Sequence, residues 1–291
     1  MELISNYMLN DQYRHMLNGL TAKVFGFDFE NWVTGGYFEG DYIPYSYMHE
    51  GKIVSNVSAN RMKFMQNGSV RNYIQIGTVM TDPDCRGQGL AAKLMNHVIE
   101  KYERDCDGIY LFGNLSALDF YRKLNFMTGN QYRYSVKDEY CVFEKEKEAF
   151  KPVLNMDESI KKEYLDMVRS SVCYSSFDQI NRFGLQMFYT AGLEDVYYCS
   201  DPDCFIVLEQ GSPAVLKSVL CSENYPLREV LRRIELKDHR LMLGFTPQDE
   251  DREICFSEEY DGGDDYRLFY RGEQLESIER DRLYFPDLSH A

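Results

Sequence analysis

The segment from Tyr73 to Tyr102 constrains the fold of this chain more than any other part of the sequence. It begins with a strand-like apolar run, Tyr73–Met80, and continues into a turn that contains Gly87 and Gly89. After Gly89, apolar residues repeat at four-residue spacing over one broad face, which predicts an amphipathic helix. The repeating residues are Leu90, Leu94 and Val98, together with Ala91, Met95, Ile99 and Tyr102.

The turn in this segment has the composition of an anion-binding site. Gly87 and Gly89 allow positive φ and a close approach of the main chain to a ligand. The first N–H groups of the following helix lack intrahelical partners and lie at the positive end of its dipole. Arg86 adds a cation. We therefore interpret the turn as a binding site for a phosphate or pyrophosphate, and not as a plain glycine turn without a ligand. A Walker loop is excluded because no Gly-Lys-Ser/Thr is present, and a Rossmann fingerprint needs three spaced glycines.

Two motifs, in this order, resemble those of the GNAT superfamily of acetyl-CoA-dependent N-acetyltransferases. Arg86–Ala91 matches the acetyl-CoA signature Arg/Gln-x-x-Gly-x-Gly/Ala, and Val79–Pro83 resembles the strand that enters it. Ala117–Phe126 resembles the family segment Ala-x-x-Phe-Tyr-x-Lys-x-Gly-Phe, with Asn125 in place of glycine. Asparagine tolerates the left-handed conformation at a helix end. The resemblance implies a mixed α/β fold (α+β, with a mixed sheet) of the GNAT type.

The resemblance also implies roles for individual residues. In the family, the strands carrying the two motifs splay apart, and a main-chain N–H of the first polarises the thioester carbonyl. Tyr121 matches the tyrosine that protonates the leaving thiolate as a general acid. The residues expected to bind acetyl-CoA are Val79, Met80, Thr81, Arg86, Gly87, Gln88, Gly89, Leu90, Ala91, Ala92, Asn114 and Ser116.

The general base is not evident on the first motif's strand. That strand has Gln75 and no carboxylate between Tyr73 and Met80, and a glutamine cannot usefully accept a proton. Carboxylates elsewhere are more often solvated surface charges than catalytic groups. The candidates elsewhere are Glu30, Glu39 and Asp41.

The C-terminal segment is a further candidate for the base. The run Tyr284–Ala291 carries apolar anchors and ends in His290 and Ala291. In aminoglycoside-acetylating relatives, the terminal carboxylate lies in the active site. We therefore predict that the carboxylate of Ala291, or His290, accepts the proton, with a frayed terminus as the alternative.

The chain is long enough for two domains. The charged run Glu144–Glu148, followed by Pro152, predicts a GNAT domain at residues 1–148 and a degenerate GNAT-like domain with a C-terminal tail at 149–291. The second half repeats the order of strands, helix and strand, but has Cys221–Pro226 where the first half has its glycine turn. This arrangement resembles the tandem acetyltransferases related to the enhanced-intracellular-survival enzymes. Locally, we predict a helical stretch over the first forty residues and strands at 132–136 and 140–144.

Composition limits the partners. A net charge of −15 argues against nucleic acid and leaves room for a cationic small molecule or a basic peptide amine. The eight cysteines contain no C-x-x-C pair and the five histidines no metal-ligand spacing, so no metal is expected. No apolar run approaches the ~20 residues of a membrane span, and no secretory signal is evident, so we expect a cytoplasmic protein. Homo-oligomerisation is left open.

These observations predict an N-acetyltransferase that transfers an acetyl group from acetyl-CoA to a primary amine of a small molecule or peptide. The alternative from another class is a sensor or regulatory module that binds acetyl-CoA without turnover. The presence of Tyr121 favours the enzyme, and the missing strand carboxylate keeps the alternative open.

Overall fold

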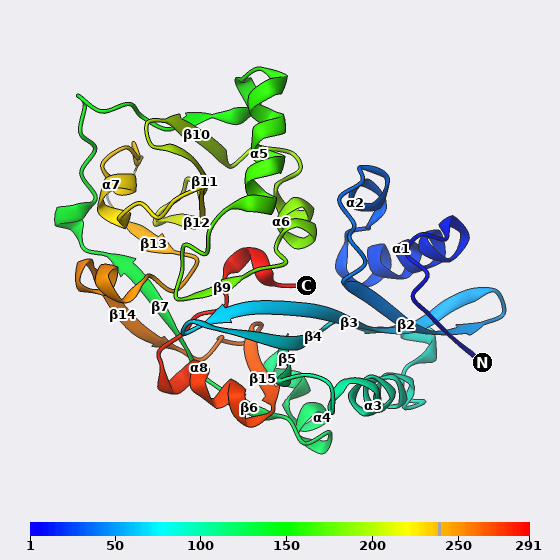
Figure 1. Cartoon of the computed structure of the whole chain (residues 1–291). Coiled ribbons are helices and arrows are strands. Elements are labelled where there is room, and N and C mark those ends of the chain that lie inside the picture. The colour runs from blue at the N-terminus through cyan, green and yellow to red at the C-terminus, as the bar shows by residue number, and fades with distance from the viewer. Residues whose placement is uncertain (238–239) are drawn as a thin grey trace.

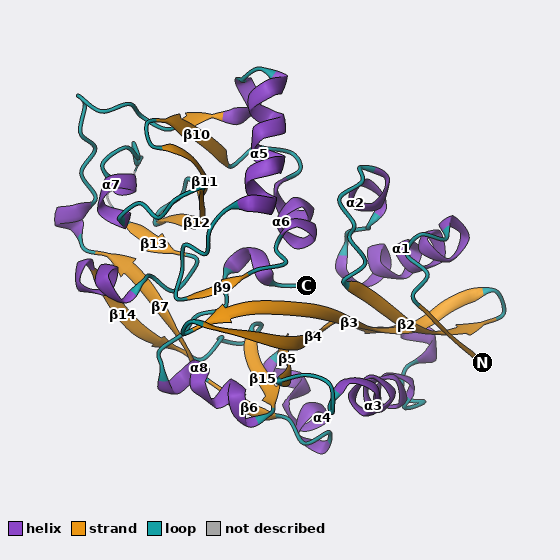
Figure 2. Cartoon of the chain, in the orientation of Figure 1, coloured by secondary structure: helices purple, strands orange, loops and turns teal. Residues whose placement is uncertain are grey.

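Two mixed β-sheets form the framework of the protein, as the computed structural model shows for residues 1–237 and 240–291 (Figures 1 and 2). The first sheet has the order β1-β2-β3-β4-β5-β15-β6, with β9 paired to β3. Its strands are β1 (Glu2–Ser5), β2 (Tyr42–His49), β3 (Lys52–Gln66), β4 (Ser69–Thr81), β5 (Gly108–Gly113), β6 (Met127–Gly129), β9 (Phe177–Gln179) and β15 (Arg267–Arg271).

Helices cover both faces of this sheet (Figure 1). On one face lie α3 (Leu90–Tyr102) and α4 (Leu118–Lys123), and on the other α1 (Asp11–Phe25) and α2 (Glu30–Thr34). The apolar repeat predicted from the sequence is the buried side of α3, where Leu94 and Val98 pack against Ile74 and Ile109 of the sheet. The predicted order of strand, turn and helix is therefore confirmed.

The second sheet has the order β14-β7-β13-β12-β11-β10-β8. In this half, β12 and β13 are parallel neighbours joined through α7, as β4 and β5 are joined through α3 in the first half. The repeat predicts a second GNAT-like unit, and the mixed second sheet agrees with it. Its elements are β7 (Gln131–Val136), β8 (Lys151–Pro152), β10 (Val196–Ser200), β11 (Asp203–Glu209), β12 (Ala214–Cys221), β13 (Leu241–Leu243), β14 (Cys255–Tyr260), α5 (Glu158–Ser170), α6 (Phe183–Thr190) and α7 (Leu227–Leu231).

The two halves exchange strands. β7, from the first half of the chain, lies between β13 and β14 in the second sheet. β15, from near the C-terminus, is inserted between β5 and β6 of the first sheet, with Tyr270 opposite Tyr110. The helix α8 (Ser277–Arg280) follows β15. The proposed boundary at residues 148/149 stays a prediction, and the sheets cross it in both directions.

Two local predictions are wrong. Residues 140–144 form no strand, because Asp138–Tyr140 is a single 3₁₀ turn and the main-chain N–H of Glu144 donates to the carbonyl of Arg232. The chain also does not start as a helix, because Glu2–Ser5 pairs with β2 as β1. Helix α1 begins after Asn10, whose side chain accepts the N–H of Tyr13.

Candidate active site

A slot opens in the first sheet where β4 and β5 separate. The two parallel strands pair over only three residues each, Tyr73–Gln75 against Gly108–Tyr110. Beyond these pairs β4 continues to Thr81 and β5 to Gly113. The ladder between neighbouring strands is thus interrupted in the middle of the sheet, at the point where β4 carries the first motif.

A bulge in β4 lies beside this slot. The step from Asn56 to Ser58 on β3 is matched by the longer step from Gly77 to Met80 on β4, so β4 contains one extra residue. Thr78, at the bulge, has a φ of 41°. Its Oγ1 lies 2.7 Å from the Tyr42 hydroxyl, and its carbonyl accepts a 3.0 Å hydrogen bond from the Asn56 amide. Because a bulged residue is left out of the ladder, its main-chain N–H is not needed for pairing with β3.

The glycine turn fits an anionic group. Gly87 and Gly89 have φ values of 77° and 71°, and a Cβ at either position would meet nothing within 4 Å. Gly89 is the N-cap of α3, the cap makes no side-chain hydrogen bond, and the first turn contains no acidic residue. The exposed Arg86 makes one long contact, 3.4 Å from Nε to the carbonyl of Thr81. First-turn N–H groups without side-chain partners, beside an exposed arginine, suit the phosphates of a coenzyme.

Two carboxylates near this turn are paired with a lysine. The Nζ of Lys23 lies 2.9 Å from Asp82 and 3.9 Å from Asp84. The hydrogen bond from Lys23 holds the pKa of the Asp82 carboxyl below its usual value. The pairing partly offsets the negative charge that precedes the anion-binding turn.

The slot opens into a cavity of about 680 Å³. Both edges of the slot line it, through Gln75–Val79 of β4 and Leu111–Asn114 at the end of β5, together with Ala117 and Tyr121. From the opposite face come aromatic residues of the α1–α2 region and of α6. The last lining residues are Asp265 and Tyr266 before β15, and His290 and Ala291 at the C-terminal end.

Tyr121 reaches this cavity from α4. Its ring packs 4.7 Å from that of Phe269, centroid to centroid, and occupies the space that a side chain at Gly113 would need. A Cβ on Gly113 would lie 2.9 Å from a ring carbon of Tyr121. Burial raises the pKa of Tyr121 to about 12, so the hydroxyl keeps its proton near neutral pH.

The C-terminal segment is anchored beside the slot rather than frayed. Phe285 is fully buried and stacks on Tyr110 with centroids 4.3 Å apart. The hydroxyl of Tyr189 donates a 2.6 Å hydrogen bond to the carbonyl of His290. Ala291 then packs against Gly77 of β4. In Figure 1 the C-terminus lies next to α6, on the face of the first sheet opposite α3 and α4.

The His290 ring is stacked and buried beside the cavity. It stacks on Phe112 with centroids 4.1 Å apart and is hydrogen-bonded to the main chain of Phe285. Burial lowers the pKa of His290 below 6.5. Among the described residues, Nε2 has no hydrogen-bond partner although the atom is buried. A buried nitrogen without a partner is unusual in a folded protein.

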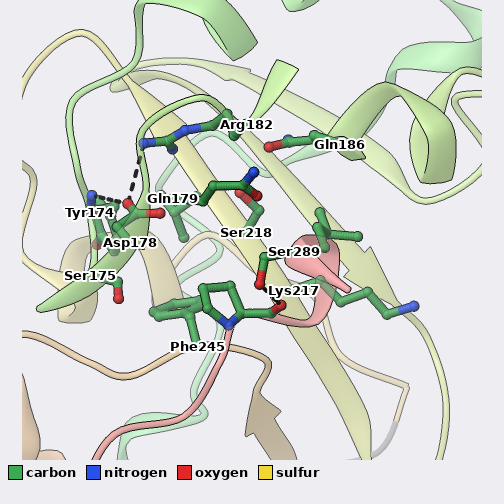
Figure 3. A pocket seen from close by; sticks show the side chains of 13 residues that line it. Tyr174, Ser175, Asp178, Gln179, Arg182, Gln186, Lys217, Ser218, Phe245 and Ser289 are labelled. Atoms are coloured by element: carbon green, nitrogen blue, oxygen red, sulfur yellow. Dashed lines mark hydrogen bonds and ion pairs between the residues drawn. The ribbon is translucent and has the colours of Figure 1, made fainter. Parts of the chain in front are cut away.

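A second, much smaller cavity lies behind the tail (Figure 3). Its volume of about 30 Å³ suits a water rather than a substrate. The Asp178 carboxylate accepts the N–H of Tyr174 at 2.8 Å and pairs with Arg182 at 3.4 Å. Ser289 lies across from Ser218 of β12 in this view and donates to the carbonyl of Pro286. This cavity therefore lies among the residues that pack against the C-terminal segment.

The structure brings part of the predicted site together. Val79, Asn114, Tyr121, His290 and Ala291 all line the large cavity. The remaining expected coenzyme contacts lie along the path from β4 through the turn to the first turn of α3, except Ser116, which is exposed after Asn114 and donates its N–H to that side chain. These contacts are Met80, Thr81, Arg86, Gly87, Gln88, Gly89, Leu90, Ala91 and Ala92.

The carboxylates considered from sequence have other partners. Glu30 binds Arg14 at 2.9 Å, Glu39 is paired with Arg169, and Asp41 accepts a hydrogen bond from Asn181. None of these three carboxylates lines the cavity.

Sequence reasoning missed the residues that the second half contributes to the cavity. These are Leu185, Phe188 and Tyr189 of α6 and the pair Asp265 and Tyr266. No local motif marks them. Asp265 and Tyr266 precede the exchanged strand β15, and the other three residues lie on α6. Asp265 is tied to the first half by a 2.7 Å hydrogen bond from Asn114.

Comparison with known proteins relates the first half of the chain to a known family. Residues 9–126 match the model of the acetyltransferase (GNAT) family. This stretch contains β4, the glycine turn, α3, β5 and Tyr121, so the family match covers the elements that border the slot. Residues 9–126 are therefore similar to the GNAT acetyltransferases, over less than half of the chain.

Solved structures extend the likeness to both halves. A GCN5-related N-acetyltransferase from Kribbella flavida has 14% identity and a TM-score of 0.58, over 95% of this chain and 73% of that one. A conserved protein from Enterococcus faecalis V583, described as a probable N-acyltransferase, has 15% identity and a TM-score of 0.56 over the same shares. Eis1 from Mycobacterium abscessus has 10% identity and a TM-score of 0.53, over 92% and 73%. At these identities the likeness concerns the fold. A search of curated proteins finds no match.

No helix in the described part of the chain is long and apolar enough to cross a membrane. Residues 1–237 and 240–291 also contain no cluster of three or more His, Cys, Asp or Glu arranged to hold a metal ion.

Proposed function

We propose that the protein transfers an acetyl group from acetyl-CoA to a primary amine in the 680 Å³ cavity. One observation carries the proposal: the bulged strand β4, Tyr121 and the C-terminal residues His290 and Ala291 line the same cavity. These are the parts that acetyl transfer requires, namely a polarising main chain, an acid and a base.

The coenzyme is assigned to the slot and the turn. The N–H groups at the start of α3 and the Arg86 guanidinium would hold the pyrophosphate. The separated strands β4 and β5 leave main-chain groups beside the pantetheine arm, with Val79 on one side and Asn114 on the other. The bulge at Thr78 offers a main-chain N–H to the thioester carbonyl, whose oxygen becomes negative as the amine attacks.

The protons are assigned to the two sides of the cavity. The amine arrives as an ammonium and must lose a proton before its nitrogen can form the C–N bond. We assign this proton to the carboxylate of Ala291 or to Nε2 of His290. As the C–S bond breaks, the Tyr121 hydroxyl donates its proton to the sulfur. The second amine proton passes through water to the Tyr121 oxygen and restores the acid, and the base releases the first proton to solvent. One amide, one thiol and one net proton are formed.

The second half of the chain completes the acceptor side in this proposal. We propose that the unit of residues 149–291 acts by supplying Tyr189, Asp265, His290 and Ala291 to the cavity and lacks a coenzyme site of its own. The segment Cys221–Pro226 between β12 and α7 has neither glycine nor arginine, which supports that view.

The test is amine-dependent release of the coenzyme thiol from acetyl-CoA, with the acetylated amine identified by mass spectrometry. The proposal expects one acetylated amine for each thiol released. The alternative, a sensor of acetyl-CoA, expects tight binding by calorimetry and no thiol release with any amine.

A further inference from the structure

The acceptor side of the cavity is built from aromatic rings. Rings of the α1–α2 region contact β2 and α6. Phe29 and Tyr42 of β2 are 4.8 Å apart, and Trp32 and Phe188 of α6 are 5.6 Å apart, centroid to centroid. Phe27 also contacts Phe188, at 5.8 Å. We call this group the aromatic wall. It consists of Phe25, Phe27, Phe29, Trp32, Tyr42 and Phe188.

The polar atoms of the wall are already occupied inside the protein. The indole N–H of Trp32 donates a 2.7 Å hydrogen bond to the carbonyl of Gly184. The hydroxyl of Tyr42 is bonded to Oγ1 of Thr78, also at 2.7 Å. The wall therefore presents ring carbon to a ligand. A hydroxyl-rich ligand would lose its bonds to water there without replacing them, which is unfavourable.

Exposed aromatic side chains gather at this cavity. Five Phe and Tyr side chains are exposed among the described residues, and four of them, Phe25, Phe27, Tyr189 and Tyr266, line the cavity. The fifth, Phe256, lies elsewhere on the edge strand β14. Large apolar groups held in contact with water at one place mark a binding surface rather than random exposure.

The cavity has little negative charge for a chain of net charge −15. Asp265 is the one Asp or Glu side chain among the described residues that line it. Together with the C-terminal group at Ala291, Asp265 suffices to attract one ammonium. A polycation would have further charges against the rings without carboxylate partners, at a large desolvation cost.

We propose that the acceptor is a small amine with a single amino group on an apolar aryl or alkyl body, rather than a polyamine or an amino sugar. The inference rests on the proposed acetyl transfer and names the class of its substrate. The apolar body packs on the aromatic wall, and the amino group is directed toward Ala291, Tyr121 and the bulge of β4. Aromatic side chains provide both the buried area and the shape for such a body.

The test compares kcat/KM for 2-phenylethylamine, ethanolamine and spermidine with acetyl-CoA as the donor. Burying a phenyl ring should raise kcat/KM for 2-phenylethylamine about 10- to 100-fold over that for ethanolamine. In Phe27→Ala, the ratio of these two values should fall about tenfold. Phe256→Ala removes an exposed ring outside the cavity, so this control should leave the ratio unchanged.

Each outcome decides between two claims. A higher kcat/KM for spermidine or ethanolamine overturns the substrate class and leaves acetyl transfer standing. Acetylation of none of the three amines, with acetyl-CoA bound, overturns the proposed transfer and the inference with it. An unchanged ratio in both Phe27→Ala and Phe25→Ala, with melting temperatures like the wild type's, removes the aromatic wall from the acceptor site.

Discussion

Ala291 lies directly against Gly77 of β4, and the contact leaves no room for a side chain at position 77. A Cβ built on Gly77 would be 2.6 Å from the carbonyl oxygen of Ala291 and 2.9 Å from its carbonyl carbon. Residue 77 belongs to the strand that borders the coenzyme slot, and residue 291 is the last of the sequence. The contact thus connects the coenzyme slot with the C-terminal segment, to which we assign the acceptor side of the proposed reaction.

Gly77→Ala should therefore displace the tail. We expect kcat/KM for acetylation to fall about 10²-fold, because small misplacements of a reacting group are costly. Unfolding should become easier by about 1–3 kcal/mol, as for other overpacked sites. Gly19→Ala is the matched control, since a Cβ at Gly19 in α1 meets nothing within 4 Å. Enzyme kinetics and thermal melting of both variants check this prediction, and equal activity in the two would refute the tail contact as functional.

The anion-binding turn makes a second prediction. Arg86→Ala or Gly89→Asp should weaken coenzyme A binding roughly 10- to 100-fold, because a charge-assisted contact is lost or a like charge is placed at the start of α3. Gly89 also has a φ of 71°, which disfavours other residues. Arg280→Ala, at an exposed residue of α8, serves as the control. Isothermal titration calorimetry giving wild-type affinity in both turn variants would remove the turn from the coenzyme site.

Tyr121→Phe should lower kcat by roughly 10²-fold or more, the scale expected when a general acid is lost. Affinity for coenzyme A should barely change, because the ring still packs on Phe269. Because burial raises the pKa of Tyr121 to about 12, the wild-type rate should show no alkaline loss from this residue near neutral pH. Wild-type turnover in the variant, with chemistry shown to be rate-limiting, would leave Tyr121 a packing residue.

Acid should destabilise the protein through His290. Burial keeps its folded-state pKa below 6.5, whereas the unfolded chain should titrate near 6.5. Below that pH the unfolded state binds more protons, so this contribution to stability is present above about 6.5 and lost as the pH falls. The variant His290→Phe keeps a ring on Phe112. Its melting temperature should decrease less between pH 7 and pH 5 than that of the wild type. An equal decrease in melting temperature in the variant and the wild type would contradict the assignment.

The sequence predicts the local parts of the site well. Helix α3 follows from its apolar repeat, and the positive φ of Gly87 and Gly89 follows from the need for glycine in such a turn. Phe285 is buried and Ala291 lines the cavity, whereas the role of the tail as the base stays a prediction. Each of these predictions depends on residues that are close in the chain or on a motif.

The long-range parts could not be predicted from local patterns. The strand β15 pairs with β5 across more than half of the chain, and periodicity carries no information about partners at that distance. The aromatic wall has the same origin, because Phe188 meets Phe27 and Trp32 only after the two halves have packed together. The apolar run at 140–144 has the local pattern of a strand but does not form one. The main-chain N–H of Glu144 is bonded to the segment after α7 rather than to a strand.

The central claim is that acetyl transfer takes place where the tail, Tyr121 and the β4 bulge meet. The most direct measurement is kcat/KM for the best amine in the full chain and in a variant that lacks Ser289–Ala291, with melting temperature and coenzyme A affinity recorded for both. The account predicts a loss of about 10²-fold or more in a folded variant that still binds the coenzyme. An unchanged kcat/KM in that folded variant would contradict it.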